Sequence, residues 1–509
     1  MRESRTYNTV RNIFYGSCSQ AFSLILNFIG RTIFIKTLGA EYLGINGLFS
    51  DVLMMLSMAD LGFNTAMVYS FYKPLTEENY DRLAALTHFY KQVYNFIAFF
   101  VAVLGVLLIP FLQYIVNLDS AIPNLKIYYL CFLANTVISY LFVYRTSIIT
   151  ADQKGYIISK YQMWVNIFRT LIQISVLVVF KNYFLYLLIQ VCATFFVNFI
   201  VSRKANKLYP KIKSTNVKLT IKEKKDIFEN LKSIFIYKVS GILINGTDNT
   251  IISILVGTIW VGYYSNYNIV INALNFFINT IFSSATASVG NAIVTENSAK
   301  KYEMFQSIQI ISLILSTFTT VCLSLLLSDL IYVWLGSEYV LDNLILISII
   351  LNFYLQCVLQ PIWSFREATG LYRQTKYIMI ITAIVNILLS IVLGKFMGMG
   401  GVFFASAISR LTTYFWYEPK LLFSQYFGER VSEYFIPLIK NALLTILIIL
   451  VFTKIFSYTV ITSWVMLILK TSIVAIITLI FIIAIYRKSE GFKVLENRIL
   501  SLFGINLKK

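Results

Sequence analysis

The sequence predicts an all-α, polytopic membrane protein of about fourteen transmembrane helices, with two parallel lobes of about six helices each and a C-terminal helix pair. Three observations predict it: the composition, apolar runs that recur along the whole chain, and an internal duplication. Of the 509 residues, 58% are hydrophobic and only 13% are charged, and the mean hydropathy is +0.72. No soluble core of this length requires so much apolar sequence, so these residues suit a bilayer.

The apolar runs are long enough to cross a bilayer, because about 20 helical residues span the hydrocarbon core. The basic start of the chain has no small-residue cleavage site after the first run, so we expect that run to be retained. The predicted spans are 12–38, 42–72, 84–115, 122–150, 156–180, 183–202, 233–257, 260–295, 303–335, 339–365, 373–397, 400–424, 434–457 and 460–486. The expected domains are an N-terminal lobe (1–202), a basic cytoplasmic interlobe loop (203–232), a C-terminal lobe (233–425), and a last helix pair with a cytoplasmic tail (426–509).

Two stretches, 27–44 and 245–262, resemble each other at an offset of 218 residues, and a second echo relates 156–163 to 372–379 at an offset of 216. The pairs in the first match are Asn27 with Asn245, Thr32 with Thr250, Ile33 with Ile251, Gly39 with Gly257, and Gly44 with Gly262. This period contains six predicted spans, an even number, so the second copy enters the membrane in the same direction as the first. Such parallel repeats are related by an axis along the membrane normal, and a site is expected between the lobes.

The net charge of +19 suggests either nucleic acid or a membrane surface, and the location of the charge decides between them. With both termini in the cytoplasm, Lys and Arg concentrate in the loops on that side, ten of them between Arg203 and Lys232. The opposite loops hold little more than Lys36, Lys126, Lys181, Lys395 and Lys454. This asymmetry is typical of membrane proteins, so the charge needs no nucleic acid. The interlobe loop either contacts anionic lipid headgroups or is a solvated connector.

Polar residues recur at helical spacing inside several spans, as Gln20, Asn27 and Arg31 do in the first, so each set lies on one face of its helix. Lipid-facing sides are apolar, because an unpaired polar group in hydrocarbon is costly. Hydrogen bonding between helices explains any one Asn, but a hydrated central cavity explains whole stripes with charged members. The candidate residues of a substrate-binding cavity are Asn27, Arg31, Arg145, Arg169, Lys238, Asn245, Asn249, Asn268, Asn272 and Asn275.

Three carboxylates in the spans, Asp51, Asp60 and Asp248, are candidates for ion coupling or for ion pairs. A structural pair is one interpretation, since the duplication puts Arg31 and Asp248 at nearly the same depth in the two lobes. In the other, basic groups hold an anionic headgroup, for which Arg suits a phosphate. Asp60 or Asp248 then takes up a proton or a cation.

No cofactor is predicted. The five cysteines lie in or beside apolar spans without CxxC spacing, so neither a metal cluster nor a disulfide framework is indicated. His88, the one histidine, is expected at the membrane interface. No GxxxxGK[ST] phosphate-binding loop is present, so ATP hydrolysis is not indicated. The energy is expected from an H+ or Na+ gradient, the membrane potential, or removal of the substrate on the far side.

Three runs, Leu38–Gly62, Asp248–Val270 and Ser283–Ile293, resemble the polysaccharide flippases of Gram-positive bacteria. These belong to the multidrug, oligosaccharidyl-lipid and polysaccharide exporter superfamily, and the resemblance covers essentially the whole chain. It implies a V-shaped transporter that moves an undecaprenyl-diphosphate-linked oligosaccharide from the inner to the outer leaflet by alternating access. The related lipid II flippases use an Arg-Asp pair on their first helix. Here that place reads Gly30-Arg31, so the pair is not preserved.

We therefore predict a non-enzymatic flippase of the bacterial cytoplasmic membrane, serving capsule or exopolysaccharide synthesis. Its expected partners are the glycolipid, membrane lipids, and the polymerase and glycosyltransferases of the pathway. A drug-cation antiporter of the same superfamily would need a more acidic, aromatic pocket, and the Arg and Lys positions count against it. A membrane-embedded polymerase or glycosyltransferase commonly needs a sizeable acidic extramembrane loop, whereas the longest loop here is rich in lysine. No motif identifies the glycan.

Overall fold

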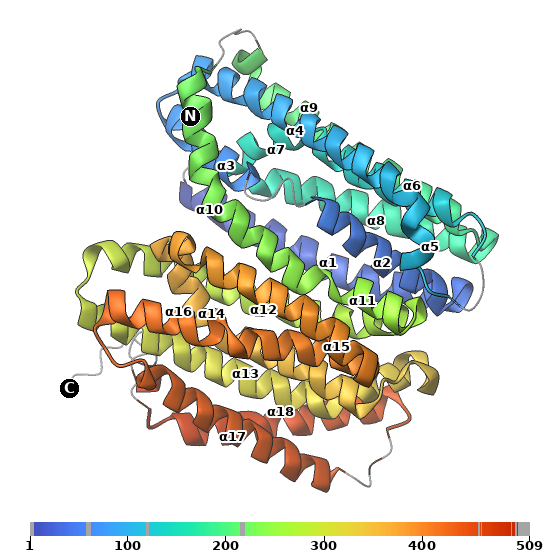
Figure 1. Cartoon of the computed structure of the whole chain (residues 1–509), viewed down its shortest axis with the longest axis vertical. Helices are drawn as coiled ribbons and strands as arrows, with labels where there is room; N and C mark the ends of the chain where they lie inside the picture. Colours follow the sequence, from blue (N-terminus) through green and yellow to red (C-terminus); the bar gives the residue numbers. More distant parts are fainter. Residues whose placement is uncertain are drawn as a thin grey trace. The chain divides into compact units, whose positions relative to one another are not determined.

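The computed structural model (Figure 1) describes residues 5–57, 63–118, 122–213, 219–456, 459, 461–489, 491–493 and 496. All regular elements in these ranges are helices, which confirms the all-α prediction. The α-helices are α1 (Arg5–Leu38), α2 (Ala40–Leu56), α3 (Phe63–Thr76), α4 (Tyr80–Leu108), α5 (Leu112–Ile115), α6 (Leu125–Tyr140), α7 (Val143–Ala151), α8 (Gly155–Phe180), α9 (Tyr183–Leu208), α10 (Ile221–Gly246), α11 (Asp248–Leu255), α12 (Thr258–Thr295), α13 (Ser298–Leu335), α14 (Asn343–Thr369), α15 (Tyr372–Thr412), α16 (Tyr414–Leu422), α17 (Ser432–Ile455) and α18 (Trp464–Tyr486). The short elements are the 3-10 helices η2 (Ile109–Phe111), η3 (Pro210–Lys213) and η4 (Ser337–Tyr339) and the π-helix η5 (Phe423–Phe427).

The chain forms two compact units, Met1–Gly262 and Tyr263–Lys509. In the first unit, α1 and α8 pack along their lengths (Figure 1) and run in the same direction. Near their starts, the Asn12 side chain accepts a 2.6 Å hydrogen bond from the Tyr156 backbone N–H. Further along, a Cβ on Gly30 would lie 3.6 Å from the methyl group of Thr170. The two contacts have nearly the same sequence offset, so the helices stay in register over this length.

The two stretches matched by the duplication share a local backbone conformation. Gly39 (φ 88°) and Gly257 (φ 136°) directly precede α2 and α12, and glycine adopts this positive φ without strain. Five residues later, Gly44 and Gly262 lie where α2 and the start of α12 cross. A Cβ on Gly44 would collide with the Thr258 carbonyl, and one on Gly262 would stand 3.0 Å from the Gly44 nitrogen. Glycine at both positions therefore allows these backbones to approach closely.

In the second unit, α13 is the central helix, buried along much of its length and packed against α14, α17 and α18 (Figure 1). Its polar residues hold the neighbouring helices. Asn441 of α17 accepts a 2.8 Å hydrogen bond from Tyr354 and donates to the Thr317 hydroxyl at 2.7 Å and the Leu313 carbonyl at 3.0 Å. Because Asn441 is fully buried, these bonds satisfy its amide where lipid offers no partner.

The long helix α15 consists of two antiparallel halves joined at Gly398, where the backbone leaves helical geometry (φ 61°, ψ −143°). The Asn386 amide donates to the Ser406 hydroxyl at 2.8 Å. The hydroxyls of Thr382 and Thr413, farther from Gly398 on each side, lie 2.6 Å apart. The segment therefore folds back on itself as a helical hairpin. Its turn lies between the two spans predicted at 373–397 and 400–424.

Ten stretches of the described residues are long and apolar enough to cross a membrane, or eleven if α6 and α7, bent by 48°, form one span. The chain is therefore a multi-pass membrane protein, but the predicted count of fourteen is not confirmed. The predicted span 42–72 is divided between α2 and α3, of 17 and 14 residues, each too short alone. Span 233–257 is broken between α10 and α11. The stretch Gln374–Phe427 is one run that contains the α15 hairpin.

Candidate functional site

Two arginines predicted to line the cavity, Arg31 and Arg169, are brought together within the first unit. Arg31 lies on α1 and Arg169 on α8, and both side chains are half-buried. Their neighbours Gly30 and Thr170 contact each other across the two helices. Each guanidinium interacts electrostatically with Tyr186 of α9. Two cationic groups from different helices therefore lie near the same phenol.

An aromatic cluster supports Tyr186. Its ring centroid lies 5.2 Å from that of Phe34 and 6.1 Å from that of Tyr183, and Tyr183 packs at 4.8 Å against Tyr128. The Gln173 side chain of α8 donates a 3.0 Å hydrogen bond to the Tyr186 carbonyl. These contacts join α1, α6, α8 and α9 beside the two arginines, so the basic site has a wall fixed by packing.

Arg169 retains unused hydrogen-bonding capacity. Its Nε is buried and has no hydrogen-bond partner among the residues that the structure describes. An N–H donor kept from water without an acceptor is costly, and an acceptor ligand removes that cost. A guanidinium presents its N–H groups in a planar fork that matches the oxygens of phosphate. The arrangement can therefore bind an anion that offers several oxygens.

The acidic candidates differ in their surroundings. The Asn249 amide donates a 2.6 Å hydrogen bond to Asp51 Oδ2 and so ties α11 to α2. The other polar atom of that amide, Asn249 Oδ1, is buried without a partner in the described part of the chain. Asp248, the first residue of α11, is half-buried. Asp60 and the side chain of Asn245 lie outside the described residues, so their roles stay predictions.

Arg145 lies apart from Arg31 and Arg169. On α7, its Nη1 donates a 2.8 Å hydrogen bond to the hydroxyl of Ser202. Ser202 stands sixteen residues beyond Tyr186 on α9, which is about 24 Å along a helix at 1.5 Å per residue. Arg145 also lines a separate pocket of about 230 Å³. The sequence analysis therefore grouped two distinct basic sites of the first unit.

The other cavity candidates are placed by the structure without being brought into one site within a unit. Asn279 of α12, outside the predicted set, accepts a 3.0 Å hydrogen bond from Gln360 of α14, which is the role of a bond between helices. The half-buried candidates are Lys238, Asn268 and Asn275, and the exposed ones are Asn27 and Asn272. A cavity between the two lobes stays a prediction.

Two ion pairs of the second unit were not predicted. Arg366 Nη1 lies 3.0 Å from each carboxylate oxygen of Glu418, and both residues are buried. Lys470 Nζ of α18 lies 2.6 Å from Asp329 Oδ2 of α13. Each is a charged residue in an apolar run, which was a usable signal. Their partners stand 52 and 141 residues away in the sequence, so the pattern alone could not identify them.

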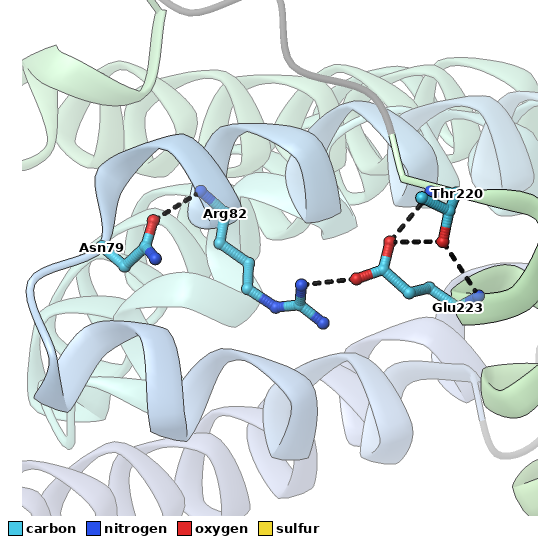
Figure 2. A network of polar contacts seen from close by, with 4 residues as sticks. All are labelled: Asn79, Arg82, Thr220 and Glu223. Carbon is cyan, nitrogen blue, oxygen red and sulfur yellow. Dashed lines mark hydrogen bonds and ion pairs between the residues drawn. The ribbon is translucent and has the colours of Figure 1, made fainter.

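Figure 2 shows an unpredicted pair of the first unit, at the start of α10, in a segment expected to be a loop. The Thr220 hydroxyl accepts from the Glu223 backbone N–H at 3.3 Å, and the Thr220 N–H donates to Glu223 Oε2 at 2.8 Å. This capping box begins the helix. Glu223 Oε1 lies 2.5 Å from Arg82 Nη1 of α4, whose own start is capped by Asn79. The Thr220 N–H, followed by Arg82, lowers the pKa of Glu223 to about 2.

His88 lies on α4 and is exposed, and its ring nitrogen is 3.3 Å from the Gln92 amide. It lines the same pocket as Arg145. In the described ranges, no three His, Cys, Asp or Glu residues are placed to hold a metal ion. The five cysteines are unpaired.

Comparison with known proteins adds a family and a fold. Residues 9–287, more than half of the chain, match the family model described as polysaccharide biosynthesis protein. No curated protein sequence matches the chain. Three solved structures are similar. The lipid II flippase MurJ in an inward closed conformation has a TM-score of 0.69 and 16% identity, over 93% of this chain and 99% of that one.

The other two structures are multidrug transporters. An inward-facing MATE family transporter of the MOP superfamily has a TM-score of 0.56 and 13% identity, over 77% of this chain and 93% of that one. A mutant of the Vibrio cholerae MATE transporter VcmN has a TM-score of 0.57 and 12% identity, over 85% of this chain and 99% of that one. At these identities the similarity shows the fold, which is common to flippases and drug transporters.

Proposed function

Because the chain belongs to the polysaccharide biosynthesis protein family, we propose that it is a flippase for undecaprenyl-diphosphate-linked oligosaccharide repeat units in the bacterial cytoplasmic membrane. Both termini lie in the cytoplasm in this proposal, as the distribution of Lys and Arg indicates. The translocated units supply capsule or exopolysaccharide synthesis, so the polymerase and the glycosyltransferases of that pathway are the proposed partners. Translocation makes and breaks no covalent bond, so the chain acts as a transporter and not as an enzyme.

The observation that carries the proposal is the position of Arg31 and Arg169 around Tyr186. A diphosphate presents several anionic oxygens, and two guanidinium groups from separate helices can each bind it through paired hydrogen bonds. Drug cations would be repelled by the same two groups. The substrate is therefore expected to carry its charge as phosphate.

The fold supports alternating access as the mechanism. The similar structures include a protein named as a lipid II flippase and a transporter in an inward-facing conformation. Our chain has two compact units, and parallel repeats of this kind move by rocking one unit against the other around a central site. We propose that Lys238 and the asparagines Asn27, Asn245, Asn249, Asn268, Asn272 and Asn275 contact the sugar hydroxyls and the diphosphate there.

Coupling is proposed at the carboxylates. Asp51 is held by the Asn249 amide in the described part of the chain. Asp60 shares the predicted span 42–72 with Asp51, and Asp248 directly precedes Asn249. A carboxylate inside a span gains or loses charge when it binds H+ or Na+. Uptake at one of the three therefore changes the hydrogen bonds between helices of the first unit, which links an ion gradient to movement.

Mass spectrometry of extracted lipids after depletion of the protein in its host tests the proposal, with the leaflet checked by an enzyme added outside the cell. Complete undecaprenyl-diphosphate oligosaccharide that accumulates out of reach of that enzyme supports a flippase. Complete units that accumulate in reach of it would show that polymerisation had been lost instead. Unchanged lipids with a new sensitivity to cationic drugs would move the function to an antiporter.

A further inference from the structure

The pocket that contains Arg145 is a basic site separate from the arginine pair described above. It has a volume of about 230 Å³ and lies within the first unit, between α4, α7, the end of α9 and η3. Its polar lining residues are Thr87, His88, Lys91, Tyr144, Arg145, Asn206 and Tyr209. No Asp or Glu is among the described residues that line it. The wall therefore offers cations and hydrogen-bond donors without an acidic counterpart.

Arg145 is held in place inside this wall. Its hydrogen bond to Ser202 uses one of five N–H donors, and Ser202 itself is only 1% exposed. The Tyr144 ring centroid lies 5.3 Å from the guanidinium carbon. A guanidinium fixed on one side by a buried hydroxyl keeps its remaining donors oriented, which lowers the entropy lost when an anion binds.

Lys91 supplies a second cation from α4. Its side chain is exposed and has no ion-pair partner among the described residues. The nearest carboxylate beyond the wall, Asp152, is already engaged: Tyr209 donates to its Oδ2 at 2.6 Å, and Lys154 Nζ lies 2.8 Å from the same atom. Burial, and then this contact, raises the pKa of Tyr209, so its hydroxyl stays a donor to Asp152. The charge of Lys91 and Arg145 is therefore left for a ligand.

Further cations surround the mouth of the pocket. Lys211 Nζ of η3 lies 4.8 Å from the Tyr80 ring and Lys224 Nζ of α10 lies 5.8 Å from the Phe89 ring. Both aromatic residues belong to α4. These lysines add positive potential, which raises the local concentration of anions.

We propose that the pocket lined by Lys91 and Arg145 binds a phosphate group, carried either by an anionic lipid headgroup or by a free phosphate. The volume accommodates one phosphate with its water. The site is about 24 Å along α9 from Tyr186, so it is distinct from the proposed transport site and does not depend on the proposed function.

The test uses the purified full chain and two probes, inorganic phosphate and phosphatidylglycerol. Thermal unfolding in phosphatidylcholine nanodiscs is measured in potassium phosphate and in potassium chloride of equal ionic strength and pH. Retention of phosphatidylglycerol against phosphatidylcholine is counted by native mass spectrometry. The variants are Lys91→Gln, Arg145→Gln and the double variant. Lys207→Gln is the matched control, because it removes an exposed lysine next to Asn206 that does not line the pocket.

The expected result is a loss of about tenfold or more in affinity for one probe in the double variant, since two charge-assisted hydrogen bonds are removed. Lys207→Gln keeps the affinity of the unmodified protein. An effect on inorganic phosphate identifies a free phosphate as the ligand, and an effect on phosphatidylglycerol alone identifies a headgroup. Lys91→Gln changes only an exposed side chain, so it guards against misfolding and shows part of the loss. Equal binding of both probes by all variants overturns the proposal.

Discussion

Gly44 and Gly262, which the duplication pairs across 218 residues, contact each other in the folded chain: a Cβ on Gly262 would stand 3.0 Å from the Gly44 nitrogen. The nearest atoms around both glycines are backbone atoms of Ala40 and Thr258. Backbone atoms cannot move aside as a flexible side chain can. The contact therefore fixes how α2 crosses the start of α12.

Gly44→Ala is expected to lower the free energy of unfolding by about 1–3 kcal/mol, the usual cost of overpacking, because the new methyl group meets the Thr258 carbonyl. Thermal unfolding in detergent measures the change. Gly290→Ala is the control: it lies on α12 with nothing within 4 Å of its Cβ, and alanine is favoured over glycine in a helix. Equal melting temperatures for Gly44→Ala and the unmodified protein would show that the crossing is not tight.

Asn249→Leu is expected to destabilise the protein by about 1–3 kcal/mol, because it leaves the Asp51 carboxylate without its 2.6 Å donor. The second variant, Asp51→Asn together with Asn249→Leu, removes the charge and should recover part of the loss. Melting temperatures of the three proteins in one detergent measure this. If both variants are equally destabilised, the cost belongs to packing around the substituted side chain on α11 rather than to the carboxylate.

Much of the fold was readable from the sequence, because apolar periodicity and charge asymmetry act over whole helices. The turn at Gly398 fell between two predicted spans, since a hairpin needs a break in the apolar run. The divisions between α2 and α3 and between α10 and α11 were missed. There the hydropathy continues across the break, so composition gives no boundary.

The candidate site was readable only in part. Helical spacing selected Arg31 and Arg169 as polar residues of apolar helices, but nothing in the sequence placed Tyr186 between them. Arg145 was grouped with them because a pattern gives the face of a helix and not the distance along its neighbour. Arg366 and Glu418 escaped notice because pairing depends on tertiary contact.

Glu418→Ala is expected to destabilise the second unit by about 3–5 kcal/mol, because it leaves the buried Arg366 guanidinium without its carboxylate partner. Glu296→Ala is the control, since its pair with Lys300 is exposed and such pairs contribute about 0–1 kcal/mol. Unfolding in detergent, followed by intrinsic fluorescence, measures both. Comparable small changes in the two variants would mean that the buried pair contributes no more than a surface pair.

The Glu223 contact is expected to depend on pH only in acid. Its folded pKa, about 2, lies below the ordinary 4.5, so the contact contributes stability above about pH 4.5 and loses it as the pH falls towards 2. The difference in melting temperature between the unmodified protein and Glu223→Ala should stay constant between about pH 5 and 8 and narrow below that. Glu77→Ala, which breaks an exposed pair with Lys73, is the control. A difference that changes between pH 5 and 8 would assign the effect to another group.

The proposed transport site predicts that Arg31→Gln and Arg169→Gln each slow translocation by about tenfold or more, because each removes a charge-assisted contact to the diphosphate. The double variant should be slowed by less than the product of the two single effects, since residues that bind one group are coupled. The same complementation assay in a flippase-null strain applies to Arg31→Ala and to Asp60→Asn, each expected to fail with normal membrane levels of the protein.

The most direct measurement of the central claim is translocation by the purified protein in proteoliposomes loaded with the undecaprenyl-diphosphate oligosaccharide from depleted cells. A glycosidase added outside reports how fast the internal glycolipid becomes accessible. The expected result is rapid exposure with the unmodified protein and slow exposure with Arg31→Gln and Arg169→Gln. Exposure at the rate of protein-free liposomes, with folded and correctly inserted protein, would contradict the assignment of a flippase.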